Sequence, residues 1–349
     1  MGTSPQPPWE RYSRQILFAP LGEAGQSELR ASHVALVGCG ALGSAQAGLL
    51  ARAGVGCLTI IDRDYVEASN LQRQSLFEEE DARESLPKAV AAARRLHALN
   101  SEVEVRAQVA DLTPENLSAL IGDAAVILDG TDNFETRYLL NDFAVEQRRP
   151  WIYGAVVGSQ GVTFTVLPEE TACLECVFGS QPGGMTESCD TAGVLNWVVQ
   201  YIAAVQVAEC VKLLVGARDA LRRTVLSADL WRNDFRQLQP PPRDPDCRVC
   251  GRRDFMHLRG ERRPHITLCG RDSVQIHEHD RAMDFGQLSQ RLAPHGRVRH
   301  NAHVLKFWLD ASSGGSGLEM TLFPDGRAMI KGTTDPAVAR SLYARYIGS

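Results

Sequence analysis

A glycine-rich segment near the start of the chain has the residue types that bind phosphate. The run GCGALG places Gly38, Gly40 and Gly43 in one turn between two apolar segments, and Asp62 follows 19 residues later. Glycines permit a tight turn and a close approach of the backbone to phosphate, and the helix that follows offers free N–H groups. A carboxylate at the end of the second strand can hold a ribose hydroxyl. The segment predicts a nucleotide site, and taken alone it indicates a nicotinamide or flavin enzyme.

A polar segment soon after Asp62 favours a triphosphate instead. It contains Ser69, Asn70, Leu71, Gln72, Arg73 and Gln74. A dinucleotide enzyme has no evident need for an arginine and two amides at this place, whereas a triphosphate does. Arg73 can form forked hydrogen bonds to phosphate oxygens, and Lys88, which opens a predicted helix, supplies a second positive charge. The alternative for either residue alone is an ordinary surface side chain.

Acidic residues follow two of the predicted strands. Asp62 and Asp64 end one strand, and Asp132 and Asn133 follow the apolar run 124–128. Ligands of open parallel sheets collect at the carboxyl ends of strands, so Asp132 is expected to face the glycine turn. A carboxylate there suits Mg²⁺, which binds a few carboxylates together with phosphate oxygens. The alternatives are that Asp62 and Asp64 cap a loop and that Asp132 caps the helix 134–147.

Four cysteines form two C-x2-C pairs, Cys173 with Cys176 and Cys247 with Cys250. Two such pairs supply four thiolates for tetrahedral Zn²⁺, and a site closed by four cysteines is structural. A redox dithiol is the competing interpretation, but it leaves the second pair unexplained. The pairs predict a structural zinc that joins the C-terminal end of the domain to the middle of the sheet.

A fifth cysteine lies between these pairs. Cys189 belongs to a segment rich in Gly, Pro and Ser, ahead of the predicted helix 194–215. A thiol near a helix N-terminus can act as a nucleophile, because the helix end favours the thiolate. The residues alone leave this role and an inert thiol equally open.

The elements that must position these residues indicate an α/β fold. The prediction is a Rossmann-like, doubly wound, mostly parallel sheet over residues 11–253, after a disordered lead at 1–10. Predicted strands lie at 33–38, 57–62, 102–107, 124–128 and 151–154, with an antiparallel strand at 162–167. Predicted helices lie at 23–31, 41–53, 88–99, 134–147 and 194–215.

Residues 254–349 are predicted to form a small C-terminal α+β domain. Its predicted strands lie at 265–268, 273–277, 304–309, 318–323 and 327–331, and its predicted helices at 284–292 and 336–346. His277 and His279 fall on one strand face, where they either bind a metal or form a solvated edge.

Composition limits the classes of function. The 349 residues carry a net charge of -5 and 44% are apolar, which gives no signature of nucleic-acid or membrane binding. The N-terminus lacks the apolar core of a signal peptide, and nine cysteines in this context indicate a reducing compartment. We expect a cytoplasmic protein with no nucleic-acid or membrane partner.

The motifs together resemble the ThiF/MoeB/HesA family, the bacterial relatives of ubiquitin-activating enzymes. The resemblance also includes the run RYSRQ at 11–15, the pair Pro87 and Lys88, and Cys189 ahead of the run AGV at 192–194. It spans residues 11–250 in order. Two departures stand out: Ala41 replaces a glycine common in this turn, and residues 83–86 lack the Val-Gly pair usual before the lysine.

The resemblance implies adenylation of the C-terminal glycine carboxylate of a small β-grasp sulfur-carrier protein with Mg·ATP. By position, Asp62 would hold the ribose and Asp132 the Mg²⁺, while phosphates would be held by Asn70, Arg73 and Lys88. Arg14 would reach into the partner subunit's site, which makes the protein a homodimer. Cys189 matches the cysteine that joins covalently to the activated carrier in ThiF-like members.

The resemblance also implies partners. These are a ThiS- or MoaD-type carrier ending in Gly-Gly and a sulfur donor such as a cysteine desulfurase. Thiamine, molybdopterin and thiolated tRNA pathways all use such enzymes, and the sequence does not choose between them. Two other functions stay open, namely adenylation of a different carboxylate, on a peptide or a tRNA base, and a dinucleotide oxidoreductase.

Overall fold

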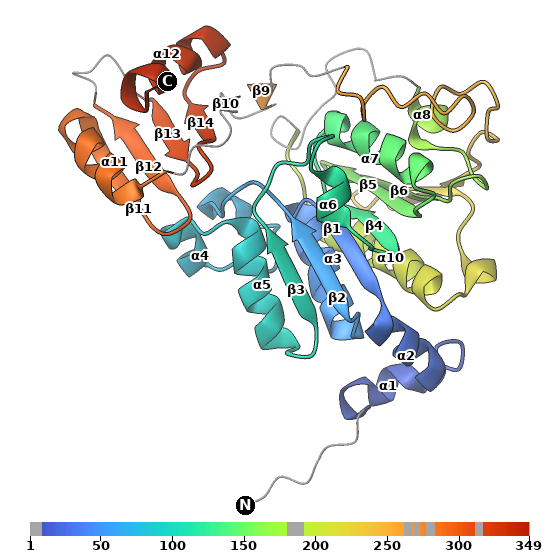
Figure 1. The fold of residues 1–349 in the computed structure, drawn as a ribbon. Coiled ribbons are helices and arrows are strands. Elements are labelled where there is room, and N and C mark those ends of the chain that lie inside the picture. Colours follow the sequence, from blue (N-terminus) through green and yellow to red (C-terminus); the bar gives the residue numbers. More distant parts are fainter. Residues whose placement is uncertain are drawn as a thin grey trace, which may run out of the picture. The chain divides into compact units, whose positions relative to one another are not determined.

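The computed structural model describes residues 9–179, 192–261, 267–268, 273–276, 283–310 and 317–348. The chain divides into two compact units (Figure 1). The first contains Met1–Ala82 and Lys88–Glu261, and the second contains Arg83–Pro87 and Arg262–Ser349. Most of the predicted disordered lead lies outside the described residues.

The first unit is built on a sheet that has eight strands within the described residues, in the order β3-β2-β1-β4-β5-β6-β7-β8. Along this order, the five strands β3, β2, β1, β4 and β5 pair in parallel with their neighbours. The pairs from β5 through β6 and β7 to β8 are antiparallel. The bounds are His33–Val37 (β1), Cys57–Ile61 (β2), Glu104–Gln108 (β3), Val126–Asp129 (β4), Trp151–Val157 (β5), Gln160–Val166 (β6), Val225–Asp229 (β7) and Asp234–Leu238 (β8). The Rossmann-like α/β core and the antiparallel β6 are confirmed. The sheet is more mixed than predicted, because β7 and β8 were not anticipated.

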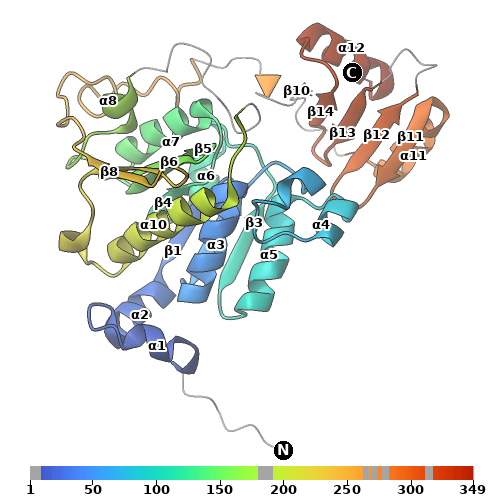
Figure 2. The same ribbon diagram turned by 180° about the vertical axis from the view of Figure 1, so that it is seen from behind.

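Helices cover both faces of this sheet, as the two opposite views show (Figures 1 and 2). On one face α3 (Ala41–Ala53) packs against α5 (Lys88–Leu99) and α10 (Asn196–Leu214). The other face carries α6 (Leu117–Ile121) and α7 (Phe134–Glu146). Because the central strands are covered on both faces, they are continuous apolar runs. Further helices are α1 (Ser13–Ile16), α2 (Gly22–Ala31), α4 (Glu79–Glu84) and α8 (Leu174–Phe178).

Helix α10 is the one helix in the described part of the chain that is long and apolar enough to cross a membrane by length and composition. It packs against α3, β5 and β6, and Val198 and Ile202 are fully buried there. A Cβ added to Gly161 of β6 would lie 2.3 Å from Ile202 Cγ1, so the helix lies directly on the sheet. This position in the core explains its apolar composition.

The second unit contains an antiparallel sheet with six strands among its described residues, in the order β11-β12-β13-β14-β10-β9. The strands are Thr267–Leu268 (β9), Ser273–Ile276 (β10), Gly296–His300 (β11), Leu305–Leu309 (β12), Glu319–Leu322 (β13) and Ala328–Lys331 (β14). Two helices, α11 (Phe285–Leu292) and α12 (Pro336–Tyr346), share one apolar core with the sheet. The predicted α+β architecture is correct, but strand β11 was not predicted because its sequence, GRVRH, is mostly polar.

Candidate active site

The glycine turn between β1 and α3 packs against the end of β4. Gly38 has a φ of +86°, and a Cβ added to Gly43 would lie 1.9 Å from the carbonyl oxygen of Gly38. A Cβ on Gly130, which follows β4, would lie 2.4 Å from the same oxygen. Three backbone segments therefore meet where only glycine fits, and Gly130 is a member of this set that sequence reasoning missed.

Gly40 has different surroundings from Gly43. It is the N-cap of α3, and the nearest atom to a Cβ added there is Gln74 Nε2 at 3.8 Å. Ala41, the first residue of α3, is partly exposed. The space in front of this helix end is therefore open, as a turn that receives a phosphate requires.

Asp62 is fixed at the end of β2 by two backbone groups. Its Oδ2 accepts a hydrogen bond from the Cys39 amide at 2.6 Å, and its Oδ1 accepts one from the Asp64 amide at 2.7 Å. Burial raises the pKa of the Asp62 carboxyl, while the Lys88 charge and these hydrogen bonds act in the opposite direction. The carboxylate thus links the end of β2 to the glycine turn.

Lys88 lies in the same cluster. It is the first residue of α5, its side chain is 3% exposed, and its Nζ lies 3.1 Å from Asp64 Oδ2. Its backbone amide also donates to the Asp64 carbonyl oxygen at 2.8 Å. The unusual segment before Lys88 therefore does not displace it from the carboxylates at the end of β2.

The segment 69–74 forms a short turn beside this cluster. Asn70 Oδ1 accepts a hydrogen bond from the Glu67 amide at 3.1 Å, as part of a capping box around the 3-10 helix Ala68–Asn70. Arg73 Nη1 donates to the Ser69 carbonyl oxygen at 2.9 Å. Gln74 is buried, and its Oε1 has no hydrogen-bond partner among the described residues. Gln72 is exposed and Leu71 is partly buried. Asn70 therefore has a structural role that the sequence did not reveal.

Asp132 follows the end of β4 and is exposed to solvent. Asn133, not Asp132, is the N-cap of α7, because its Oδ1 accepts a hydrogen bond from the Thr136 amide at 2.8 Å. The alternative that Asp132 caps the helix is therefore wrong. Since β2 and β4 flank β1 on its two sides, Asp64 and Asp132 follow strands that end at the same, carboxyl edge of the sheet.

Arg63 connects these carboxylates electrostatically, and sequence reasoning missed it. Its Nη1 donates to Asp111 Oδ1 at 2.9 Å. Burial lowers the pKa of the Arg63 guanidinium, but three nearby carboxylates outweigh that effect and raise it overall; they are Asp111, Asp64 and Asp132. A charged residue between two acidic ones gives no sequence signal that separates it from a surface arginine.

A buried ion pair lies behind Asp132 and was also missed. Arg137 of α7 donates from Nε to Asp129 Oδ2 at 3.0 Å, and the side chains are 6% and 0% exposed. Burial lowers the pKa of the Arg137 guanidinium, but the charge and hydrogen bond of Asp129, together with Tyr153 and Asp132, outweigh that effect and raise the pKa overall. The sequence signal that could have revealed this pair is Asp129, a charged residue directly after the apolar residues VIL of β4.

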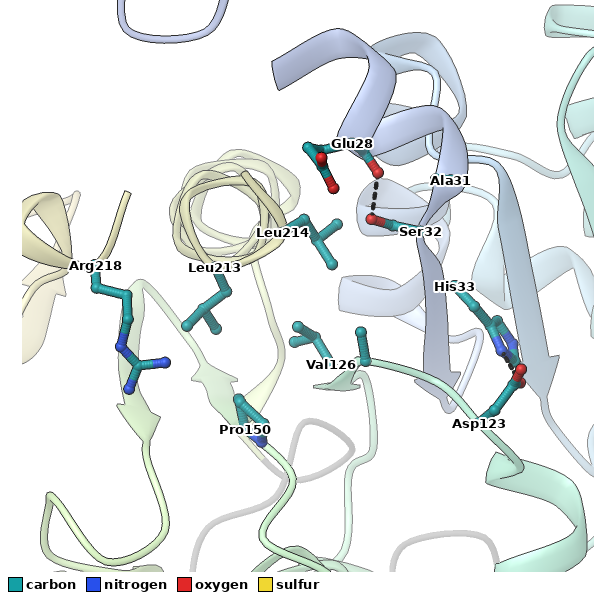
Figure 3. A pocket seen from close by; sticks show the side chains of 11 residues that line it. Glu28, Ala31, Ser32, His33, Asp123, Val126, Pro150, Leu213, Leu214 and Arg218 are labelled. Atoms are coloured by element: carbon teal, nitrogen blue, oxygen red, sulfur yellow. Dashed lines mark hydrogen bonds and ion pairs between the residues drawn. The ribbon is translucent and has the colours of Figure 1, made fainter. Parts of the chain in front are cut away.

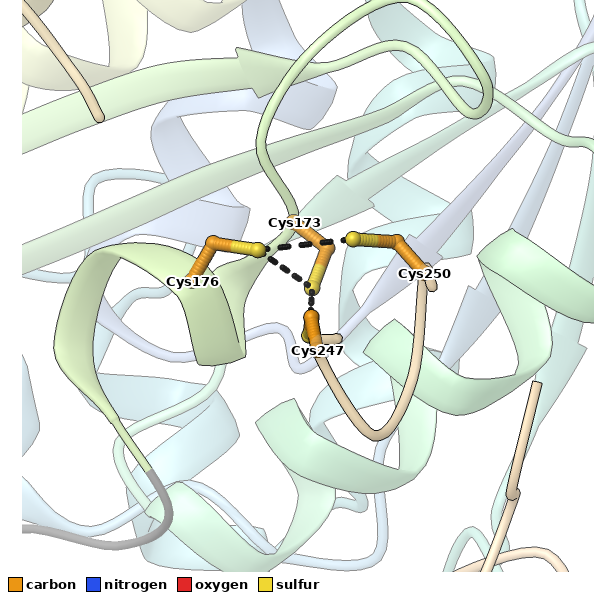
Figure 4. Close-up of side chains that lie close together, drawn as sticks. All are labelled: Cys173, Cys176, Cys247 and Cys250. Atoms are coloured by element: carbon orange, nitrogen blue, oxygen red, sulfur yellow. Dashed lines mark hydrogen bonds between the residues drawn. The ribbon is translucent and has the colours of Figure 1, made fainter. Parts of the chain in front are cut away.

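The four cysteines of the two C-x2-C pairs come together (Figure 4). Their Sγ atoms all lie within 4.8 Å of one another, with separations of 3.9 Å for Cys173–Cys176, 3.7 Å for Cys173–Cys247 and 3.4 Å for Cys176–Cys250. Tetrahedral zinc with Zn–S bonds of about 2.3 Å separates its sulfurs by about 3.8 Å. The donor set and its spacing therefore fit a metal such as zinc.

An ion pair joins the two cysteine pairs outside this cluster. Glu175, between the first two cysteines, accepts hydrogen bonds from Arg248 Nε at 3.2 Å and Nη2 at 2.5 Å. Asp142 Oδ1 lies 3.6 Å from Arg248 Nη2, and its Oδ2 accepts from the His257 amide at 2.9 Å. Burial raises the pKa of Asp142 to about 7. Asp142 thus connects α7 to Arg248, the residue that joins the two cysteine pairs.

One other predicted site residue, Arg14, is described by the structure, and three are not. Arg14 is exposed on α1, followed by Leu17 and Phe18, which are 72% and 66% exposed. Cys189, His277 and His279 lie outside the described residues.

A separate crevice of about 390 Å³ lies at the opposite, amino-terminal ends of the strands (Figure 3). It is lined by His33 at the start of β1, Val126 at the start of β4 and Leu213 near the end of α10. His33 Nδ1 lies 2.7 Å from Asp123 Oδ1, and its Nε2 lies 2.8 Å from Thr59 Oγ1. The crevice contains none of the predicted site residues, and His33 already has partners. We therefore do not assign the crevice to the active site.

The fold and the site define a class: a doubly wound nucleotide-binding fold with carboxylates and a lysine at its carboxyl edge and a four-cysteine cluster. The model of the ThiF family matches residues 12–249. The chain therefore belongs to the ThiF family.

Comparisons with individual proteins agree. The chain is similar to the Sulfur carrier protein ThiS adenylyltransferase of Bacillus subtilis, with 45% identity over 343 residues, 97% of this chain and 99% of the relative. It is 37% identical to the Sulfur carrier protein adenylyltransferase of Thermus thermophilus over 69% of this chain and 90% of that relative. A crystal structure of E. coli MccB with MccA-N7isoASN shares the fold, with a TM-score of 0.62, 24% identity and coverage of 71% of this chain and 76% of that one.

Proposed function

We propose that this protein uses Mg·ATP to adenylate the C-terminal glycine carboxylate of a small β-grasp sulfur carrier of the ThiS or MoaD type. The observation that carries the proposal is the 45% identity to a ThiS adenylyltransferase along 97% of this chain. The site supports it, because phosphate-binding and acidic groups gather at the carboxyl edge of the sheet. A nicotinamide enzyme would not require Arg73 and Lys88 there.

The reaction needs little acid–base chemistry from the protein. A carboxylate oxygen of the carrier attacks the α-phosphorus of ATP, the bond from this phosphorus to the bridging oxygen breaks, and pyrophosphate leaves. The carboxylate is already a nucleophile, so catalysis consists mainly of positioning and of neutralising charge.

The residues divide this work by their places. We propose that Asp62 holds the ribose and that the turn at Gly40 receives phosphate at the N-terminus of α3. Arg73 and Lys88 would hold phosphate oxygens, which requires Lys88 to exchange part of its contact with Asp64 for the nucleotide. Asp132 would hold Mg²⁺, which neutralises phosphate charge when bound.

We propose that the four-cysteine cluster holds a structural zinc. The Sγ separations support it, and all four positions are filled by protein ligands, so the metal would take no part in the chemistry.

A homodimer would complete the site with Arg14 of the partner subunit. The exposed arginine and the exposed Leu17 and Phe18 beside it support this, because large apolar side chains at a surface mark interaction sites. Mixing two inactive variants, Arg14→Ala and Asp132→Ala, tests it. In mixed dimers one site has both residues, so about one quarter of wild-type activity should return. No recovery after subunit exchange would exclude sharing of Arg14.

A covalent step would follow adenylation. The thiolate of Cys189 would attack the carbonyl carbon of the acyl adenylate, forming a thioester and releasing AMP, before a sulfur donor such as a cysteine desulfurase supplies sulfur. Cys189→Ser is expected to retain pyrophosphate exchange and to lose the covalent carrier adduct. Loss of exchange in this variant would refute the separation of the two steps.

Carrier-dependent exchange of labelled pyrophosphate into ATP tests the proposed function. We expect exchange with a β-grasp carrier ending in Gly-Gly, none with a carrier lacking the last glycine, and none with Asp132→Ala. Absence of exchange with any such carrier would overturn the proposal, and exchange with a peptide acceptor instead would reassign the substrate.

A further inference from the structure

A buried guanidinium supports the loop that carries Asp132. Arg137 is 5% exposed and lies in the first turn of α7, directly after that loop. Its Nε donates to Asp129 Oδ2, and its Nη2 donates to the carbonyl oxygens of Thr131 at 2.7 Å and of Gly154 at 2.9 Å. One side chain therefore joins the end of β4 and the middle of β5 to α7.

Thr131, the residue before Asp132, is held at each of its polar groups. Its amide and its Oγ1 donate to Asp129 Oδ1 at 2.9 and 2.7 Å, and its carbonyl oxygen accepts from Arg137. On the other side of Asp132, Asn133 is fixed as the N-cap of α7. The backbone on both sides of the exposed carboxylate is thus immobilised by groups that do not include its own side chain.

Stability alone does not account for this arrangement. Buried ion pairs contribute little net stability, and apolar residues of similar size often replace them without loss. The guanidinium also lies between two rings, with its Cζ 5.4 Å from the centroid of Phe134 and 5.1 Å from that of Tyr153. What an apolar side chain could not reproduce is the set of hydrogen bonds from two guanidinium nitrogens, Nε to Asp129 and Nη2 to the carbonyl oxygens of Thr131 and Gly154.

We propose that Arg137, through its pair with Asp129, is a positioning residue that aims the Asp132 carboxylate at the metal and phosphates of bound nucleotide. The inference rests on the proposed function, since it gives Asp132 its target. It adds that the position of the Asp132 carboxylate is set by Arg137, which does not itself contact the ligand. Small errors in such positions are costly, since a displacement of about 1 Å can reduce rates on the order of a hundredfold.

The test is Arg137→Lys, which keeps the positive charge for Asp129 but has one nitrogen in place of two, so it cannot donate to Asp129 and to both carbonyl oxygens at once. We expect kcat of carrier-dependent pyrophosphate exchange to fall roughly tenfold or more, and the Mg²⁺ concentration for half-maximal activity to rise roughly tenfold. The KM for the carrier should not change. A merely structural role predicts a lower Tm with the Mg²⁺ requirement unchanged, and that result would overturn the inference.

A second variant covers the case in which Arg137→Lys does not fold. Thr131→Val removes only the hydroxyl donor to Asp129 and leaves the ion pair intact, so the same rise in Mg²⁺ requirement is expected at about a third of the size. A wild-type Mg²⁺ requirement in a folded Thr131→Val protein would count against the inference.

Arg327→Lys is the matched control. Arg327 is 4% exposed, pairs with Asp325 at 2.6 Å and lies over the ring of Phe323, but it belongs to the second unit. It should lose thermal stability without a change in kcat or Mg²⁺ requirement. If the control shifts the Mg²⁺ requirement equally, the effect is general loosening and the inference fails. If the wild-type protein shows no exchange with any carrier, the proposed function is wrong. If the wild-type protein is active but Arg137→Lys leaves the Mg²⁺ requirement unchanged, only the inference about Arg137 is wrong.

Discussion

Replacing Gly43 and Gly40 separately by alanine should distinguish the packing glycine of the turn from the ligand-binding one. A Cβ on Gly43 would lie 1.9 Å from the carbonyl oxygen and 2.8 Å from the carbonyl carbon of Gly38. These are backbone atoms, which cannot rotate out of the way. A Cβ on Gly40 would have its nearest neighbour, Gln74 Nε2, at 3.8 Å, which is an ordinary contact.

The magnitude follows from two opposing effects. Overpacking costs about 1–3 kcal/mol, and occasionally more, while alanine in a helix interior gains about 1 kcal/mol over glycine. Because the Gly43 contacts are with backbone, we expect the upper end of the cost and a net loss of roughly 2 kcal/mol. That loss corresponds to a fall in Tm of roughly 4–8 °C. Gly40→Ala loses only the N-cap preference, at most about 1 kcal/mol.

Thermal unfolding without nucleotide and titration with Mg·ATP measure the two effects. Gly43→Ala should melt earlier, whereas Gly40→Ala should melt close to wild type but bind ATP roughly tenfold more weakly, because its Cβ occupies the space that phosphate approaches. A Gly43→Ala protein with the wild-type Tm would refute the close-packing argument. Wild-type ATP affinity in Gly40→Ala would refute the assignment of the phosphate to this turn.

Three further predictions concern the cysteine cluster and its surroundings. The purified protein should hold stoichiometric zinc by elemental analysis, and a chelator or Cys250→Ser should lower its Tm, because metal affinity is folding free energy in such sites; a metal-free native protein would contradict this. Arg248→Met should speed zinc release to a chelator roughly tenfold, since it removes the forked contact with Glu175 that joins the two cysteine pairs, and an unchanged release rate would exclude that role. Burial raises the pKa of Asp142 to about 7 in the folded protein, above its ordinary value of 3.8. The resulting contribution to the free energy of unfolding is therefore complete below about pH 4 and is lost as the pH rises through about 7. The Tm of Asp142→Asn relative to wild type should therefore be higher at pH 8 than at pH 5, and a constant difference would show that the pKa is not raised.

Local patterns in the sequence were sufficient for the core of the fold. The predicted helix 41–53 has the observed bounds of α3, and the apolar runs at 33–38 and 57–62 correspond to β1 and β2 within a residue. Such elements can be predicted because strands covered on both faces are continuous apolar runs, and because a glycine turn marks where one element ends. The edge strands β8 and β11 were missed because their polar residues remove the apolar signal, whereas β7 was missed although most of its five residues are buried.

The candidate site was also predictable from the sequence only in part. Spacing alone predicted that the four cysteines would come together, because C-x2-C pairs carry their chemistry in a few adjacent residues. It could not show that Asn133 rather than Asp132 caps α7, since either residue satisfies the preference for a cap. That choice depends on the backbone conformation at the end of β4.

The sequence by itself determined the glycine turn, the acidic strand ends and the paired cysteines, since each depends on neighbours along the chain. Only the tertiary structure decided that Gly130 closes against Gly38, that Arg137 is buried beneath Asp132 and that Arg248 joins the two cysteine pairs. The contacts of Gly130 with Gly38 and of Arg248 with Glu175 connect segments far apart in the sequence, and an arginine such as Arg137 gives no local sign of whether it will be buried. Their geometry exists only after the strand order places β4 beside β1 and α7 beneath the site.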